Sequence, residues 1–397
     1  MTRMPVAVFS DHDISTPGDV TTLLEAAMRF APDGLHLRIY ATAAFAIDTE
    51  TCFTTASWQI RRRSRSDRRL PLPNLALLAR QVRAQHATII HIATNGVMGL
   101  TGRWLAGRLR LPLVASCQAP PVSVSSDPTL LERARIGYIR WLYDSSHVIL
   151  VPSHAVAASL RSLGRPGPRL RVWTRGVDAV AFDPSFASKP LRARWHVDHR
   201  RPAIACIADA RCDRIVSLLP AVERLLHRHA VAHQFVVLGS GRWTRALVEK
   251  CPAAVVLKTP APHDIAVAMA SADVALSLAA TDPIGSGVLE ALASGLPVVV
   301  TDDGDAQETM QGTATVVSSA CRPESIASAL IALLSQPKRR HQMAIAARAF
   351  AEGQPWPAAL EPFFSAWRVA SLGTDQSPAH HLPTVLPTRP TRSATSL

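Results

Sequence analysis

Cysteine is scarce in this chain of 397 residues, and no two of its cysteines form a C-x-x-C pair. A disulfide scaffold needs numerous cysteines and a zinc site of the common kind needs closely spaced ones, so neither is expected. The six cysteines are expected to be reduced core residues of a cytoplasmic protein: Cys52, Cys117, Cys206, Cys212, Cys251 and Cys321.

Aromatic residues and long apolar runs are also few. Phe, Trp and Tyr make up 5 % of the chain, with three tyrosines, whereas surfaces that bind nucleic acid interleave aromatic side chains with basic ones. Nucleic acid is therefore not an expected partner. No window approaches about 18 uninterrupted apolar residues, and the opening MTRMPVAVFSDHD has too short an apolar run for a signal peptide. We expect a cytoplasmic protein that is not exported by that route.

Acidic residues are outnumbered, since 43 Lys and Arg face 30 Asp and Glu, for a net charge of +13. Such an excess indicates an anionic partner, either a lipid surface or a phosphorylated substrate. The charge is densest at residues 61–69, where two interpretations stay open: a solvated loop, or a contact with anionic lipid headgroups. The arginines of this segment are Arg61, Arg62, Arg63, Arg65, Arg68 and Arg69.

Hydrophobic residues make up 48 % of the chain, as short β-branched runs that alternate with segments of helical period. This alternation predicts parallel strands separated by helices, and it restarts after residue 200. Strands are expected at 5–10, 35–41, 88–93, 111–116, 147–153, 202–208, 234–240, 272–278 and 295–301. Helices are expected near 20–31, 74–86, 98–110, 129–146 and 154–163. The predicted fold class is α/β, with two Rossmann-like, doubly wound domains facing a cleft.

Two segments interrupt this rhythm. Residues 179–201 are rich in charge and contain prolines, so we expect the linker there, after an N-terminal domain at 1–178. Residues 372–397 contain four prolines and many Ser and Thr, which predicts a disordered tail. Because ligands of open α/β sheets bind at the carboxyl ends of strands, function is expected in the loops that follow them.

The most informative loop is TDPIGSGVLEALASGLPVVV, residues 281–300. Gly285 and Gly287 precede a helical run that Gly295 closes. A glycine-rich turn that opens a helix presents backbone N–H groups and the positive end of the helix dipole, which suits a phosphate or a sugar hydroxyl. Glu290, one turn into the helix, can accept hydrogen bonds from both hydroxyls of a ribose. The alternative is an ordinary connection between a strand and a helix with surface acids.

This string resembles one in the retaining family 4 glycosyltransferases, which have two Rossmann-like domains in the GT-B arrangement. In the resemblance, Glu290 matches the second glutamate of the family's Glu-x7-Glu element, a ribose ligand, and Asp282 stands in place of the first, which contacts the donor sugar. LGSG at 238–241 resembles the nucleotide loop, and TPGDVTTLL at 16–24 the N-terminal glycine loop near the donor phosphates. The implied donor site is Gly18, Gly239, Ser240, Gly241, Asp282, Ile284, Gly285, Ser286, Gly287, Val288, Leu289 and Glu290.

The similarity extends over most of residues 5–370. VWTRGVDAVAFDP at 172–184 looks like the family's hinge, and GQPWPAALEPFFSAW at 353–367 resembles its C-terminal helix, which crosses back onto the first domain. The resemblance thus implies a nucleotide-sugar-binding domain at 202–353 and a crossover helix at 354–371.

The sequence departs from the family at charged positions. The family's Arg and Lys, which neutralise the leaving diphosphate, read Ala208 and Asp213 here, and Asp213 opposes donor binding unless it turns away or pairs with Arg211 or Arg214. Those two arginines could reach the diphosphate from shifted positions. The family's acceptor-side histidine is Gln118, which cannot act as an acid or base. The expected catalytic residues are Gln118, Asp282, Arg211 and Arg214.

Two functional hypotheses follow. The first is a hexosyltransferase that needs no cofactor or metal, uses a UDP- or GDP-linked sugar and a lipid or saccharide acceptor, and works in the cytoplasm or at the inner face of the membrane. The second is a catalytically weak or inactive paralogue that binds a nucleotide sugar or a partner protein.

Other polar motifs are assigned no function. His12, between Asp11 and Asp13, is expected in a loop with scattered acids rather than a metal site. Ser240 lacks the Gly-x-Ser-x-Gly turn of hydrolases. A solvated helix end is expected for His227, His229 and His233.

Overall fold

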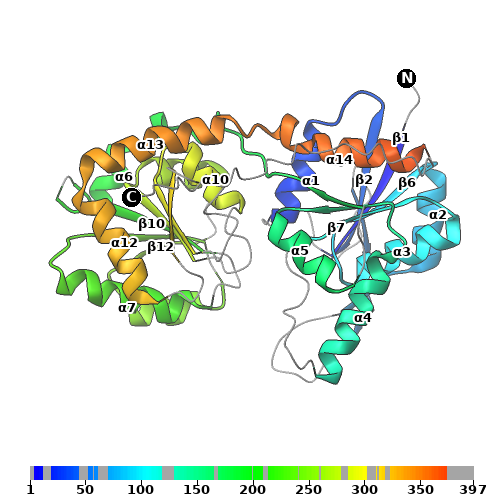
Figure 1. The fold of residues 1–397 in the computed structure, drawn as a ribbon, viewed down its shortest axis with the longest axis horizontal. Coiled ribbons are helices and arrows are strands. Elements are labelled where there is room, and N and C mark those ends of the chain that lie inside the picture. The colour runs from blue at the N-terminus through cyan, green and yellow to red at the C-terminus, as the bar shows by residue number, and fades with distance from the viewer. Residues whose placement is uncertain are drawn as a thin grey trace, which may run out of the picture.

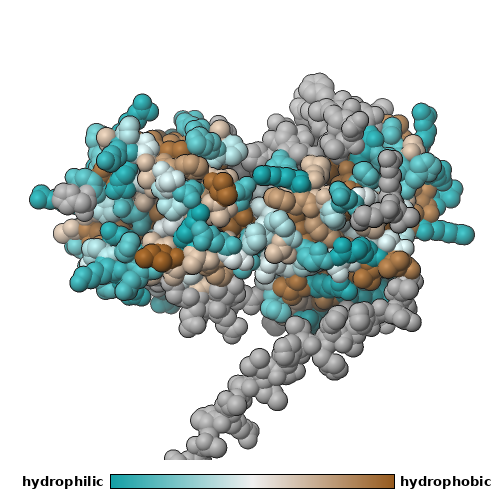
Figure 2. Space-filling model, turned by 90° about the horizontal axis from the view of Figure 1, so that it is seen from above, coloured by the Kyte–Doolittle hydropathy of each residue, from teal (hydrophilic) through white to brown (hydrophobic). Residues whose placement is uncertain are grey.

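The computed structural model of the chain describes residues 4–11, 19–43, 52–56, 58–60, 70–118, 129–164, 169–198, 200–208, 213–239, 241–258, 261–278, 285–301, 310, 313–317 and 322–372. The chain forms two α/β units that lie side by side, each built around one parallel sheet (Figure 1). On the face shown in Figure 2, hydrophobic side chains of the described residues form small separate groups among hydrophilic ones. The large hydrophobic residues are instead concentrated in the two sheets and the helices that cover them.

The N-terminal unit contains a seven-stranded parallel sheet with the order β3-β2-β1-β6-β7-β8-β9. Its strands are β1 (Met4–Ser10), β2 (Leu35–Ala43), β3 (Cys52–Ala56), β6 (Ile89–Ile92), β7 (Leu113–Ser116), β8 (Val148–Val151) and β9 (Leu170–Val172). A separate antiparallel pair is formed by β4 (Trp58–Ile60) and β5 (Leu70–Leu72).

Side chains alternate along each strand, so each face of this sheet packs against its own helices. Val6 and Val8 pack with α1 and α14, whereas Ala7 and Phe9 pack with the helices α2 to α5 on the other face. The helices are α1 (Asp19–Arg29), α2 (Leu75–Ala84), α3 (Val97–Leu109), α4 (Leu130–Asp144), α5 (His154–Ser162) and α14 (Trp356–Ser371). Helix α14 comes from the far end of the chain and runs along the N-terminal unit (Figure 1).

The C-terminal unit contains a six-stranded parallel sheet with the order β12-β11-β10-β13-β14-β15. Its strands are β10 (Ala203–Ile207), β11 (Gln234–Leu238), β12 (Val255–Leu257), β13 (Val274–Ser277), β14 (Val298–Thr301) and β15 (Ala314–Val317). One face is covered by α9 (Pro262–Ala270), α10 (Ser286–Ala293) and α13 (Pro337–Glu352), and the other by α7 (Ile215–Arg228), α8 (Thr244–Lys250) and α12 (Pro323–Ser335).

The predicted α/β class with two doubly wound sheets is confirmed, and each strand and helix predicted from the sequence has a counterpart within a few residues. The strands that the sequence analysis missed are the pair β4 and β5 and the edge strands β3, β9, β12 and β15.

The segment at 179–201, expected as a linker, packs against the C-terminal sheet. It contains the turn η1 (Pro184–Phe186) and the helix α6 (Lys189–Arg194), followed by the buried side chains of Trp195 and Val197. Arg192 forms an ion pair of 3.1 Å with Asp273, whose carboxylate also accepts a hydrogen bond from the backbone N–H of Ala203. Arg194 and Arg200 are exposed, Arg192 and Arg201 are partly buried and hydrogen-bonded, and the apolar residues of the segment complete the core.

The chain passes twice between the two units, and the two passages lie against each other. Val177 pairs in parallel with Pro355, and its N–H donates to the carbonyl of Gln354 over 2.9 Å. A Cβ atom at Gly176 would lie 2.7 Å from the Cα atom of Trp356, so the close approach requires glycine. The two passages therefore form one connection.

A buried histidine joins α14 to the N-terminal sheet. Trp367 donates its indole N–H to Nδ1 of His91 over 3.0 Å, and the other ring nitrogen, Nε2, lies 2.8 Å from Oγ of Ser116. Because Nδ1 accepts, the neutral ring carries its proton on Nε2 and donates to Ser116. Burial lowers the pKa of His91 to about 3.

Acidification is expected to destabilise the N-terminal unit. The unfolded chain protonates His91 below a pH of about 6.5, whereas the folded chain does so only near a pH of about 3, so stabilisation present above pH 6.5 is lost as the pH falls between these values. His91 alone should lower the free energy of unfolding by on the order of 1 kcal/mol per pH unit in this window.

Urea unfolding followed by tryptophan fluorescence at several pH values measures this slope. His91→Gln retains an acceptor for Trp367 and a donor for Ser116 but cannot be protonated, so it should flatten the slope. The same change at exposed His154 is the control. Equal slopes for wild type and His91→Gln would contradict the prediction.

Candidate functional site

Strand order locates the crevice at which each sheet can bind a ligand. In the C-terminal sheet the chain begins at β10 and proceeds outward through β11 and β12 on one side and β13 to β15 on the other. Open α/β sheets bind ligands where the order reverses, beyond the carboxyl ends of the strands. That point lies after β10 and β13, and the corresponding point of the N-terminal sheet lies after β1 and β6. The residues singled out from the sequence follow these strands and their neighbours.

Two glycines bring three segments together at the end of β10. A Cβ atom at Gly239, which follows β11, would lie 2.2 Å from the backbone oxygen of Ala208, and Gly239 has a φ of +126°. A Cβ atom at Gly287 in α10 would lie 2.8 Å from Cγ2 of Ile207. Both contacts exclude larger residues, so the loop after β11 and the first turn of α10 lie directly against the end of β10.

Helix α10 presents its first turn at this crevice. No side chain caps its start, because the N-cap residue is Gly285, whose carbonyl accepts from the N–H groups of Val288 and Leu289. The side chains of Val288 and Leu289 are buried in the core, so they hold the helix in place. Glu290 follows on a partly exposed side of the helix. In Figure 1, α10 lies on the side of its unit that faces the N-terminal unit.

Asp213 forms an ion pair with Arg242, a residue that the sequence analysis did not single out. Arg242 donates two hydrogen bonds to the carboxylate of Asp213, and it lowers the pKa of that carboxyl group. The sequence analysis named Arg211 and Arg214 as residues that could pair with Asp213; Arg211 lies outside the described residues, and the ion pair with Arg242 meets the same need for a compensating charge. Arg214 instead begins α7, where its carbonyl accepts from the hydroxyl of Ser217.

A pocket of about 790 Å³ opens beside the LGSG loop. Its lining includes three basic residues: Arg242 directly precedes the N-cap of α8, Arg245 lies in the first turn of α8, and Lys258 follows β12. The full lining is Gly241, Arg242, Thr244, Arg245, Val248, Glu249 and Lys258. The signal for Arg242 was present in the sequence, directly after Gly241, whereas Lys258 follows a strand that the sequence analysis missed.

At the crevice of the N-terminal sheet, a carboxylate joins the loop after β1 to the loop after β6. Asp11, after β1, accepts hydrogen bonds from the N–H groups of Gly96 and Met98 over 2.9 and 2.8 Å and from the hydroxyl of Thr94. A carboxylate in this position stabilises the start of α3. Asp11 therefore has a structural partner, and its neighbours His12 and Asp13 lie outside the described residues.

Gln118 follows β7 at the same edge of the N-terminal sheet. Both atoms of its amide are buried, and neither has a hydrogen-bond partner among the described residues. Buried polar groups nearly always have partners, so an amide of this kind indicates a place where a ligand can bind.

Several predicted site residues lie outside the part of the chain that the structure describes. They are Gly18, Arg211, Ser240, Asp282, Ile284 and the arginines of 61–69. The structure brings Ala208, Gly239 and Gly287 together, and it places Gln118 on the other unit. In the described ranges every helix is too short or too polar to cross a membrane.

Two family models match this chain. The model of glycosyltransferase family 4 matches residues 16–180, and that of the glycosyl transferases group 1 matches residues 201–336. A GDP-mannose-dependent alpha-mannosyltransferase of Mycobacterium tuberculosis is 29 % identical over 292 residues, which are 72 % of this chain and 74 % of that protein. The sulfoquinovosyl transferase SQD2 of Arabidopsis thaliana is 28 % identical over 281 residues, which are 68 % of this chain and 54 % of that protein.

Solved structures share the fold at low sequence identity. A sucrose-phosphate synthase from Thermosynechococcus elongatus has a TM-score of 0.75 at 16 % identity, covering 94 % of this chain and 100 % of the other. HepE from Anabaena, solved with UDP-glucose, has a TM-score of 0.71 at 15 % identity, covering 94 % and 99 %.

Gly239→Ala should destabilise the C-terminal unit by at least about 2 kcal/mol, because its methyl group would overlap the backbone oxygen of Ala208 and its φ is unfavourable for alanine. Gly137→Ala in α4 is the matched control, since a methyl group there meets nothing within 4 Å and should stabilise the helix by about 0.5 to 1 kcal/mol. Urea unfolding of both variants measures the difference. A Gly239→Ala chain as stable as wild type would mean that the loop is not held against β10.

Proposed function

The chain belongs to the family 4 glycosyltransferases of the GT-B fold, and on this premise we propose that it transfers a hexose from a nucleoside diphosphate sugar to a lipid or saccharide acceptor with retention of the anomeric configuration. The observation that carries the proposal is the uncapped start of α10, which lies against the end of β10 at the reversal of strand order, with Glu290 one turn along. A helix start at such a crevice favours a diphosphate, and a carboxylate one turn along can accept hydrogen bonds from a ribose, which supports the proposal.

The proposed donor lies along the C-terminal unit. Glu290 would accept hydrogen bonds from the ribose hydroxyls, the Gly285 turn and Asp282 would hold the sugar, and the loop at 239–241 would face the base and phosphates. The mannosyltransferases among the relatives are named for GDP-mannose, which makes GDP-mannose the first donor to test. UDP-glucose is the second, because the neighbour HepE was solved with it.

Side-chain cations would neutralise the leaving diphosphate without a metal. Arg242 already compensates the charge of Asp213, and Lys258 lines the same pocket beside Gly241. Together with Arg214, and with Arg211 if it reaches the same edge of the sheet, these groups would supply positive charge from several loops. Gly18 would approach the diphosphate from the N-terminal unit.

On the acceptor side, the buried amide of Gln118 would hydrogen-bond an acceptor hydroxyl. An amide cannot take up a proton near neutral pH, so it would position the acceptor only. The acceptor proton would then pass to the departing phosphate of the donor, which is consistent with retention.

Glu290→Gln should weaken GDP or UDP binding by roughly 10- to 100-fold, because it removes the charge from two hydrogen bonds to the ribose. Glu324→Gln, at an exposed position in the first turn of α12, is the control. Calorimetry measures nucleotide affinity, and product analysis with GDP-mannose and UDP-glucose measures transfer. Unchanged affinity in Glu290→Gln would refute the donor site. Binding that depends on Glu290 without any transfer would instead support the paralogue that binds a nucleotide sugar.

An exposed apolar groove of the N-terminal unit supports a lipid acceptor at a membrane surface. The groove has a volume of about 910 Å³ and is lined in part by Leu100, Trp104 and Trp141, which are 41 %, 46 % and 46 % exposed. The guanidinium of Arg103 lies 4.2 Å from the ring centre of Trp141, and Arg108 and Arg110 line the same groove. Aromatic side chains with arginines suit the interface of an anionic bilayer. We propose that this groove and the arginines of 61–69 dock the protein there.

Sedimentation with anionic vesicles at low salt tests the docking. Changing Arg61, Arg62, Arg63 and Arg65 to Ser should weaken binding by up to about 1,000-fold, an effect that salt should reduce. Trp104→Ser with Trp141→Ser should also weaken it, with less dependence on salt. Ile345→Ser on α13, where the side chain is 59 % exposed, is the control. Equal sedimentation of all variants would refute the docking proposal.

A further inference from the structure

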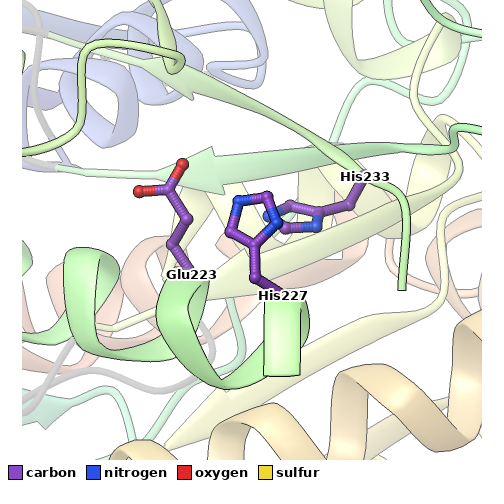
Figure 3. Close-up of side chains that lie close together, drawn as sticks. All are labelled: Glu223, His227 and His233. Atoms are coloured by element: carbon purple, nitrogen blue, oxygen red, sulfur yellow. The ribbon is translucent and has the colours of Figure 1, made fainter. Parts of the chain in front are cut away.

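A second group of polar side chains lies at the opposite end of the C-terminal sheet from the candidate donor site. Glu223 and His227 are four residues apart on α7, so they share one face of that helix. His233 directly precedes β11. One carboxylate oxygen of Glu223 and one ring nitrogen of each histidine all lie within 4.8 Å of one another, and Figure 3 shows the three side chains gathered at the end of α7.

The turn after α7 brings His233 back to the helix. Ala230 adopts a left-handed conformation with a φ of +53°, its N–H donates to the carbonyl of His227, and the N–H of Val231 donates to that of Leu226. His233 is then buried, at 7 % exposure. The expectation of a solvated helix end is therefore wrong for His233, because the chain reverses within a few residues.

Contacts on its other side fix the ring of His233. Its Nδ1 lies 2.9 Å from the carbonyl oxygen of Val231, and since a carbonyl can only accept, Nδ1 carries the proton and Nε2 the lone pair of the neutral ring. The ring also packs edge-on against Phe235 at 4.7 Å. In a histidine that binds a metal, the ring nitrogen that does not bind it usually donates its N–H to a backbone carbonyl or a carboxylate.

The carboxylate of Glu223 is oriented in a similar way. The thiol of Cys251, which is buried after α8, donates to Oε2 of Glu223 over 3.1 Å. No hydrogen bond or ion pair joins Glu223, His227 and His233 to one another, although all three lie in the described chain and converge. Three groups with lone pairs that converge without hydrogen bonds to one another are suited to a shared cation.

We propose that Glu223, His227 and His233 bind one Zn²⁺ ion. Two imidazole nitrogens and one carboxylate oxygen form a ligand set typical of zinc. In a tetrahedral site with bonds of about 2.0 to 2.2 Å, ligand atoms lie about 3.3 Å apart, so shifts of about 1 Å would complete the coordination. His227 is exposed, which leaves the fourth position to water.

This ion stabilises the fold and takes no part in sugar transfer. It connects the end of α7 with the start of β11 and, through the thiol of Cys251, with the end of α8. The end of α7 and the start of β11 lie at the amino ends of the strands, whereas Gly239 and the first turn of α10 lie at their carboxyl ends. The proposal therefore stands independently of the donor site.

The test uses the full chain without a polyhistidine tag, stripped of metal by a chelator and titrated with ZnCl₂ in a calorimeter. Wild type should bind one tight equivalent of Zn²⁺. His227→Ala and Glu223→Gln should each weaken that equivalent by at least about 100-fold, more than changes outside the ligand set usually do. His229→Ala removes an exposed histidine from the same helix end and should bind Zn²⁺ like wild type.

Thermal unfolding supplies a second readout that does not depend on activity. At a Zn²⁺ concentration about 100 times the Kd, the Tm of wild type and His229→Ala should rise by about 5 °C, and that of His227→Ala should not. Absence of a tight equivalent in wild type, or equal Zn²⁺ affinity in wild type and His227→Ala, would overturn the proposal. A Tm that Zn²⁺ leaves unchanged in wild type would also overturn it.

Discussion

The pairing of Val177 with Pro355 is the contact on which the arrangement of the two units depends. Both passages of the chain meet there, and Gly176 permits the approach to the backbone of Trp356. Beyond this point each passage is anchored by burial: α14 inserts Trp367 into the N-terminal core, while residues 179–197 complete the C-terminal core. Because both passages are paired there, this connection constrains where Gln118 lies relative to α10.

Arg348 extends that constraint to the candidate donor site. Its guanidinium donates to the carbonyls of Ala179 and Phe182 in the first passage, to that of Ala293 at the end of α10, and to the carboxylate of Asp183. These backbone oxygens would otherwise lack partners at the end of a helix and in a turn. The helix whose first turn forms the proposed donor site is thus held at its last turn to the segment that joins the units.

The sequence predicted the interior of the fold well and its margins poorly, for a physical reason. Interior strands such as β7, β8 and β13 are buried along their whole length, so each is a continuous apolar run. The edge strands β9 and β12 are only partly buried and three residues long, which leaves no distinct pattern. The burial of Trp195 and Val197 within the expected linker was also not visible in the sequence, because two apolar residues among charged ones give no pattern.

The candidate site contains some residues that are close together in the sequence and others that come from separate loops. Gly285, Gly287 and Glu290 lie within one turn and one helix, so their spacing was enough to predict that a glycine-rich turn opens a helix there. Positive charge at the site is not determined by one local segment, because the loops that follow all strands of a parallel sheet meet at the same end of the sheet. Ala208, after β10, carries no charge, but Arg242 after β11 neutralises Asp213, and Lys258 after β12 adds a cation beside Gly241. The absence of a basic residue from one loop is therefore weak evidence that the site lacks positive charge. The charges of all loops at the carboxyl ends of the strands have to be compared together.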